Sequence, residues 1–255
     1  MKKLTFDPRL LLVGIGLCLV AGPASADEDF LTDEDLYDEE ISEGAPVSDP
    51  FESFNRYTFR FNDFVYVNLV GPLADGYQAV TPDPVEDGAD NFFYNLKYPV
   101  RLAANLLQGR VKGAAVETGR FVVNTGCSLG LATPADEIKM LESIPPEDMG
   151  QAFGSWGIGE GPYLVLPLLG PSNLRDLAGY IGDRAVNPLQ QPFDLTDEDN
   201  WNWGWEPGFI LGVTEFTVSS PSIMELYEQL KGPAIDPYSS IRNGYTQFRR
   251  AAVKE

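Results

Sequence analysis

Histidine is absent from the 255 residues of this chain. Its absence excludes Ser-His-Asp and Cys-His catalysis, His-ligated zinc and the commonest general base of enzymes. Catalysis by a pair of carboxylates, as in hydrolases that act on cell-wall glycan, remains an alternative. Aspartate and glutamate are so plentiful here that the sequence names no such pair. We therefore predict no catalytic residue and no metal ligand.

Basic residues are also scarce, with 18 Lys and Arg against 38 Asp and Glu and a net charge of −20. A protein that binds phosphate backbones needs a basic surface, so nucleic acid is excluded as a partner. The same charge disfavours loose electrostatic attachment to anionic lipid. Any contact with a membrane must therefore be mainly apolar.

The chain has only two cysteines, Cys18 and Cys127. Cys18 lies in a candidate targeting segment, so the processed chain would keep a single thiol and could form no internal disulfide. Small and apolar residues surround Cys127, a setting typical of a buried structural thiol. We expect Cys127 to be buried.

Residues 1–26 have the three parts of a secretory signal peptide. A basic start is followed by an apolar run of about a dozen residues, too short to span a bilayer readily. The run ends before Ala24-Ser25-Ala26, a small-x-small cleavage pattern. Lipidation at Cys18 is the alternative, but Leu17 stands where bacterial lipidation normally needs a small residue. The sequence favours cleavage after Ala26.

Residues 27–48 hold ten acidic residues and no basic one. Such a segment repels itself and cannot bury enough apolar surface to fold. We predict a solvated, disordered tail here, followed by one folded domain at 49–255.

The folded domain begins with a predicted helix. Asp49 is expected to cap it, with Pro50 in the first turn and Glu52 completing a capping box. Four aromatic residues then recur at spacings of three and four: Phe54, Tyr57, Phe61 and Phe64. Such a face packs into a core or contacts lipid, and the core is the commoner use in proteins generally. We expect Gly71-Pro72 to end this helix.

Further helices are predicted at 85–96, from Pro99 to Gly109, at 111–129, after a cap at Ser172 or Asn173, at 208–231 with an interruption at Pro221, and at 237–253. The expected apolar face of 111–129 comprises Val111, Ala115, Val122 and Leu129, and the small residues Gly113, Ala114, Gly119 and Gly126 would allow close helix contacts.

Two segments break the helical pattern. Residues 154–171 combine glycine-rich turn chemistry with an extended run in which Pro162 and Pro167 disfavour a central strand. Residues 192–207 form an acidic loop with three alternate tryptophans, Trp201, Trp203 and Trp205. These tryptophans suit either a membrane boundary or ordinary loop packing.

Outside the signal peptide, the sequence has no run of eighteen apolar residues, so a transmembrane helix is not expected. Short amphipathic helices rich in aromatic residues suit a protein that lies in one leaflet. They suit a plain soluble helical domain equally well.

Several blocks in fixed order resemble the MlaA/VacJ family over about residues 49–250. They are DPFESFNR at 49–56, NFFYNL at 91–96, NLLQG at 105–109, RFVVNT at 120–125, FGSWG at 153–157, GPY at 161–163, LP at 166–167, GP at 170–171, LRD at 174–176 and DPY at 236–238. The glycine- and proline-rich blocks between 153 and 176 are the most specific of these.

The resemblance implies an all-α, ring-like bundle of short amphipathic helices around an amphipathic channel. It implies a non-enzymatic protein without a cofactor, held in the inner leaflet of the outer membrane on its periplasmic side. Such proteins remove phospholipid from the outer leaflet and pass it to a periplasmic carrier, which maintains lipid asymmetry. Expected partners are phospholipid, a trimeric porin and the carrier. Family members are often lipoproteins, and the poor context of Cys18 departs from that pattern.

Polar and aromatic residues in or near the DPFESFNR and LRD blocks are our candidates for the lipid path. Phe54, Tyr57, Phe61 and Phe64 would face lipid or the ring core, and Asn55, Arg56, Asn62, Arg175 and Asp176 would line or brace the path. For Arg175 and Asp176 we favour a structural contact at a helix start. The alternative function is that of a soluble periplasmic binding or scaffold protein.

Overall fold

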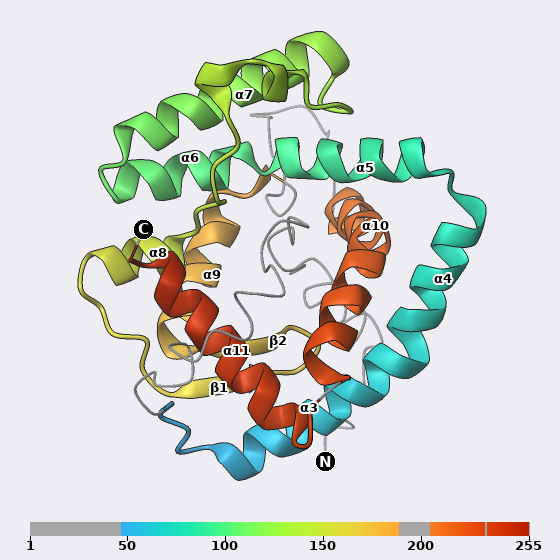
Figure 1. The fold of residues 1–255 in the computed structure, drawn as a ribbon, viewed down its shortest axis with the longest axis vertical. Helices are drawn as coiled ribbons and strands as arrows, with labels where there is room; N and C mark the ends of the chain where they lie inside the picture. Colours follow the sequence, from blue (N-terminus) through green and yellow to red (C-terminus); the bar gives the residue numbers. More distant parts are fainter. Residues whose placement is uncertain (1–46, 189–204, 233, 255) are drawn as a thin grey trace, which may run out of the picture.

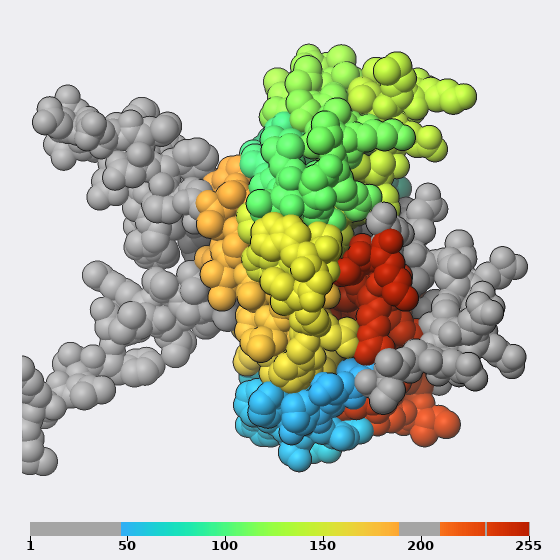
Figure 2. Space-filling model, turned by 90° about the vertical axis from the view of Figure 1, so that its left-hand side faces the viewer, coloured from blue at the N-terminus to red at the C-terminus, as the bar shows by residue number. Residues whose placement is uncertain are grey.

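The computed structural model describes residues 47–188, 205–232 and 234–254. Helices follow one another around the rim of a flattened, ring-like body, which Figure 1 shows face-on and Figure 2 edge-on. This arrangement confirms the predicted helical fold. The predicted signal peptide and the predicted acidic tail up to residue 46 lie outside the described residues. So do Trp201, Trp203 and the side chain of Trp205.

The first half of the ring is an arc of consecutive helices (Figure 1). It comprises α3 (Glu52–Val65), the π-helical turn η2 (Tyr66–Val70), α4 (Gly71–Val80), α5 (Asp83–Leu96), α6 (Tyr98–Leu107) and α7 (Val111–Ser128). Proline stands in the first turn of α5 and α6, where its missing N–H costs no helical hydrogen bond, and Pro72 stands where the π-helical turn passes into α4. The arc therefore turns at prolines without losing its helical character.

The second half closes the ring (Figure 1). It comprises η3 (Pro134–Glu137), η4 (Lys139–Leu141), α8 (Met149–Ser155), the antiparallel hairpin of β1 (Tyr163–Leu166) and β2 (Gly170–Asn173), α9 (Leu174–Val186), α10 (Trp205–Lys231) and α11 (Pro237–Ala252). Helix α10 packs on α4, α8 packs on α9, and α11 lies against β2. The extended run predicted near 162–171 is thus a two-stranded hairpin, with Pro167 in its turn.

Of three predicted helix boundaries, one is confirmed and two are wrong. Asn173 caps α9 as expected, because its side chain accepts the amide hydrogen of Asp176. Gly71-Pro72 does not end the first helix, since η2 carries the chain directly into α4. Pro221 does not interrupt α10, because the Ser220 hydroxyl donates at 2.7 Å to the carbonyl of Thr217, which proline leaves without its helical partner.

The predicted capping box at the start of α3 is wrong. Phe51 occupies the cap position and makes no side-chain cap. The carboxylate of Asp49 instead accepts hydrogen bonds from Asn55 and from the Tyr238 hydroxyl, and it pairs with Arg242 of α11. Asp49 therefore joins the entry of α3 to α11, across nearly the whole chain.

Helix α7 is oriented opposite to our expectation. Val111, Ala115, Val122 and Leu129 are all exposed, Leu129 at 75 %, whereas the buried positions include Glu117, Arg120 and Asn124. Cys127, predicted to be buried, is exposed as well. The close contacts expected from small residues are present at two of the glycines: a Cβ at Gly113 would meet Asn105 of α6, and a Cβ at Gly119 would meet Leu141. Polar residues, more than apolar ones, hold α7 in place.

Buried apolar residues form small separate clusters among the described residues. One joins Val70, Ala74 and Met224, a second joins Phe93 and Val218, and a third joins Tyr163, Val165 and Tyr238. A protein of this size usually has one contiguous core. In this ring, separate apolar clusters stabilise different parts of the structure, and buried ion pairs fill part of the space between them.

The largest buried ionic cluster lies where α8, α9 and α11 meet. Asp176 accepts hydrogen bonds from Arg175, Arg249 and the hydroxyl of Tyr245, and Arg249 also binds Asp148 with both of its terminal nitrogens. Burial alone would raise the pKa of Asp176, but the hydrogen bonds and charge of Arg249 lower it below its usual range. The carboxylate is therefore charged in the folded protein.

Replacing Asp176→Asn should destabilise the protein by about 3–5 kcal/mol, because it leaves the buried Arg249 and Arg175 without their shared counter-charge. Urea unfolding followed by circular dichroism measures the change. Asp75→Asn, on the exposed side of α4, is the control and should leave the free energy of unfolding unchanged to within ~0.5 kcal/mol. Equal stabilities of the two variants would contradict the bracing role of Asp176.

The pKa of Asp183 in α9 is raised, whereas that of Asp176 is lowered. Burial and the nearby Asp148 raise the pKa of Asp183 to about 7, although its carboxylate accepts the amide hydrogen of Met149. The folded state then holds a proton that the unfolded chain loses near pH 4, so stability should fall as pH rises from 4 to 7.

Asp183→Asn keeps the acceptor and removes the charge. We expect it to exceed the wild type in stability at pH 8 by the order of 2–4 kcal/mol, with the difference vanishing near pH 4. Thermal unfolding across this pH range tests this, and a gap independent of pH would refute it.

Candidate functional site

Four aromatic side chains of α3 form an exposed stripe, which we call the aromatic stripe: Phe54, Tyr57, Phe61 and Phe64. Tyr57 is 74 % exposed and Phe64 is 65 % exposed. The interpretation of this stripe as a core face is therefore wrong. The aromatic residue of α3 that does enter a cluster is Phe59, which lies edge-on to Tyr238. A row of large exposed aromatics on one helix marks a surface made for contact with something apolar.

Asn55 fixes the direction in which the aromatic stripe points. Its side chain is fully buried and bonds to β1 in both directions. The Asn55 amide nitrogen donates to the carbonyl of Tyr163 at 3.0 Å, and the amide of Val165 donates to the Asn55 oxygen at 2.9 Å. One side chain thus replaces the neighbouring strand that the edge of β1 lacks.

Asn62 repeats this contact two helical turns further along. Its amide nitrogen donates to the carbonyl of Leu166 at 2.8 Å, and its oxygen accepts from the amide of Leu168 at 2.8 Å. Residues seven apart share one face of a helix. Because Asn55 and Asn62 hold that face on the hairpin, the aromatic stripe is left on a face turned away from it.

Arg56 connects α3 to the start of α11. Its guanidinium binds Glu52 at 2.7 Å, binds both carboxylate oxygens of Asp236 at 3.1 and 2.7 Å, and lies over the ring of Tyr238. The hydrogen bonds from Arg56 and then from Ser239 hold the pKa of Asp236 well below its usual range. Arg56 therefore braces the ring at the point where its two ends meet.

Arg175 and Asp176 are buried at the start of α9, in the ionic cluster described above. The structure brings Asn55, Arg56 and Asn62 together around α3 and the hairpin. It places Arg175 and Asp176 in that separate cluster. All five polar candidates brace the frame, and the four aromatic candidates point out of it.

A second set of buried polar residues, on α6 and α7, was not predicted from the sequence. Arg101 binds the buried Glu117 at 2.8 Å, and Arg120 binds Asp136 at 2.7 Å. The signal was present, because Glu117, Arg120 and Asn124 recur at helical spacing. We assigned the opposite, apolar side of α7 to the interior because apolar faces are usually buried.

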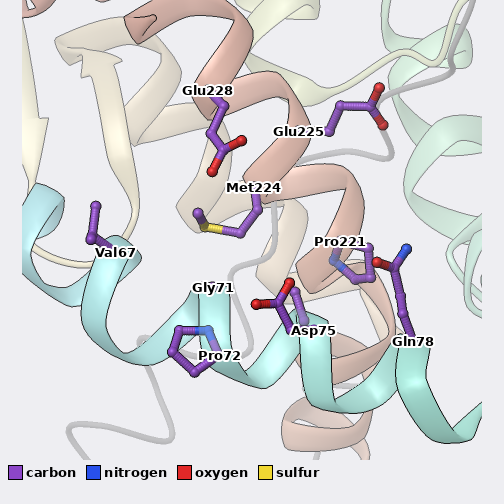
Figure 3. A pocket seen from close by; sticks show the side chains of 10 residues that line it. Val67, Gly71, Pro72, Asp75, Gln78, Pro221, Met224, Glu225 and Glu228 are labelled. Atoms are coloured by element: carbon purple, nitrogen blue, oxygen red, sulfur yellow. The ribbon is translucent and has the colours of Figure 1, made fainter.

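A pair of hollows on the described surface differ in chemistry. The larger, about 440 Å³, lies between α4 and α10 and carries the carboxylates of Asp75, Glu225 and Glu228, as Figure 3 shows. Its acidic wall would repel a phosphate group. The smaller, about 270 Å³, is lined mostly by apolar residues with Arg175 at its side. Among the described residues, no cluster of acidic or sulfur side chains has the arrangement of a metal site.

None of the described helices combines the length and the apolar character that crossing a membrane requires.

Comparison with known proteins gives consistent results. Residues 47–252 match the MlaA lipoprotein family. An intermembrane phospholipid transport system lipoprotein MlaA of Haemophilus influenzae is 30 % identical over 210 residues, which covers 82 % of this chain and 80 % of the relative. The protein of the same name from Escherichia coli is 31 % identical over 183 residues, covering 69 % and 65 %. An uncharacterized protein of Rickettsia bellii is 28 % identical over 96 % of this chain and 92 % of its own length.

A solved structure from work on the structural basis for maintenance of bacterial outer membrane lipid asymmetry has a similar fold. The TM-score is 0.66 at 27 % identity, and the match covers 81 % of this chain and 99 % of that one. The matched family spans the whole ring from the segment before α3 to the end of α11, and this chain belongs to the MlaA lipoprotein family.

Proposed function

We propose that this chain is a non-enzymatic phospholipid transporter of the bacterial outer membrane. It removes phospholipid from the outer leaflet and passes it to a periplasmic carrier, which maintains lipid asymmetry. It would sit in the inner leaflet beside a trimeric porin. The names of the relatives from Haemophilus influenzae and Escherichia coli support the transport role.

One observation carries the proposal: α3 and α7 expose large apolar side chains, while charged residues of the ring are buried. Charged residues such as Glu117 and Glu215 are almost fully buried, while the aromatic stripe and the apolar side of α7 are exposed. In water, each exposed aromatic ring forgoes burial worth a few kcal/mol. In hydrocarbon the same rings are favourably solvated. The surface therefore suits a body embedded in one leaflet.

The transport mechanism would follow from solvation alone. A phospholipid headgroup is costly to move through hydrocarbon, because its charged and polar groups lose their hydrogen bonds to water. An amphipathic channel through the ring would shelter the headgroup while the acyl chains stay in apolar surroundings. Uptake by the carrier would give the movement its direction, and no covalent step would be needed.

The residue roles we propose follow the geometry. The aromatic stripe contacts lipid, whereas Asn55, Arg56 and Asn62 keep the ring closed around the path. Arg175 and Asp176 hold α9 against α8 and α11. Anchoring would come from the apolar surface if cleavage follows Ala26, with Cys18 as the alternative anchor if it is lipidated.

Deletion of the gene should raise the amount of phospholipid exposed on the cell surface, measured by enzymatic labelling of outer-leaflet lipid in intact cells. Expression of the wild-type chain should reverse the rise. An unchanged outer leaflet in the deletion strain would count against transport and favour a soluble periplasmic binding or scaffold role.

The double substitution Tyr57→Ser with Phe64→Ser should release the protein from membranes without unfolding it. Cys18→Ser is added to every variant so that no acyl anchor contributes. We expect at least a tenfold smaller membrane fraction after a high-salt wash, because two exposed rings lose their burial in lipid. The free energy of unfolding should change by less than about 1 kcal/mol, since neither ring is buried in the protein.

Phe59→Ala is the contrasting variant on the same helix. It should cost about 2–4 kcal/mol of stability, because Phe59 packs on the cluster of Tyr163 and Tyr238. Unchanged membrane retention of the double variant would show that the aromatic stripe is not the lipid contact.

A further inference from the structure

Arg60 of α3 differs from the other arginines of the described residues. The others form an ion pair with a carboxylate or, for Arg184, bind the Tyr180 hydroxyl. Arg60 is exposed and has no hydrogen bond, ion pair or ring contact within the part of the chain that the structure describes. In a chain with a net charge of −20, an arginine without a counter-charge is unusual.

The acidic residues nearest to Arg60 on α3 are already engaged. Asp63, one turn further along, binds Lys231 and the hydroxyl of Tyr227 of α10. Glu52, two turns earlier, binds Arg56. The nearby carboxylates of α3 are therefore engaged elsewhere, and the guanidinium of Arg60 has no counter-charge among the described residues.

Arg60 stands at the edge of the aromatic stripe. Tyr57 is three residues before it and Phe64 four residues after it, so the three side chains are neighbours on the helix surface. Arg56, one turn earlier on the same side, reaches across to Asp236 at the start of α11. Arg60 therefore lies on the side of the stripe that faces α11, where the apolar surface gives way to charged groups.

We infer that Arg60 binds the phosphate of a membrane phospholipid and marks the headgroup level on the α11 side of the ring. This inference rests on the proposed function, because it requires the aromatic stripe to lie in lipid. It adds the orientation of the body: the flat side that carries α10 and α11, on the right in Figure 2, meets the headgroups.

The chemistry of the site favours this ligand. A guanidinium binds two phosphate oxygens in a planar fork, and its long aliphatic stem can cross apolar surface to reach the interface. Tyrosine beside it is suited to the same depth, since its ring is apolar and its hydroxyl polar. The net negative charge of the chain repels anionic lipid, so Arg60 can attract a headgroup only at short range.

Arg60→Gln tests the inference, with Arg60→Lys and Lys254→Gln as companions. Lys254 is another exposed cation, away from the aromatic stripe, so its substitution removes the same charge. The purified processed proteins are equilibrated with vesicles of phosphatidylethanolamine and phosphatidylglycerol, and with vesicles of a phosphate-free galactolipid. Bound protein is measured by flotation. The N-terminus is the same in every variant, so its contribution cancels in the ratio of partition coefficients.

Arg60→Gln should lower partitioning into phospholipid vesicles about fivefold, the effect of one basic residue at a lipid surface, with no change on galactolipid. Lys254→Gln should match the wild type, and Arg60→Lys should keep most of the affinity. Equal binding of wild type and Arg60→Gln to phospholipid overturns the inference and points to a protein carboxylate as the partner. An equal loss on both lipids also overturns it, because the contribution of Arg60 would then not depend on phosphate. A wild type that binds neither vesicle overturns the proposed function itself.

Discussion

The structure depends on two asparagine side chains that bind a strand edge. Asn55 and Asn62 bond with both amide groups to β1 and to the turn that follows it, at distances of 2.8 to 3.0 Å. These bonds satisfy backbone groups that would otherwise be buried without a partner, and they fix the rotation of α3 about its axis. A helix held by a polar face must turn its aromatic residues outward. The exposure of the aromatic stripe therefore depends on hydrogen bonds in the interior.

Buried polar contacts also occur elsewhere in the ring. Small apolar clusters alternate with buried ionic contacts such as Arg101–Glu117 and Asp176–Arg249, and the exposed side of α7 is apolar. A buried charge destabilises a protein unless it keeps its partner. A buried ion pair often contributes more to a specific geometry than to stability. A ring without one large core needs that specificity. Arg56 and Asp49 provide this specificity where the ring closes, because their ion pairs link the start of α3 to α11.

Much of the fold could be predicted from the sequence. Proline positions and helical periodicity predicted helices at 85–96, 99–109, 111–129 and 237–253, which match the structure to within a few residues, and Asn173 was one of two predicted caps. Local chemistry decides these features. The errors lie where distant partners compete: Asp49 binds Tyr238 and Arg242 instead of capping α3, and Asn62 serves the hairpin about a hundred residues away.

The sequence by itself determined the helical class, the absence of histidine chemistry, the acidic charge and the positions of the aromatic and polar residues along each helix. Only the tertiary structure decided which face of α3 and α7 is buried. Periodicity shows that a helix has two faces, but it does not show which medium surrounds each one. That choice depends on pairings such as Asn55 with β1 and Arg101 with Glu117, which form only when distant segments meet.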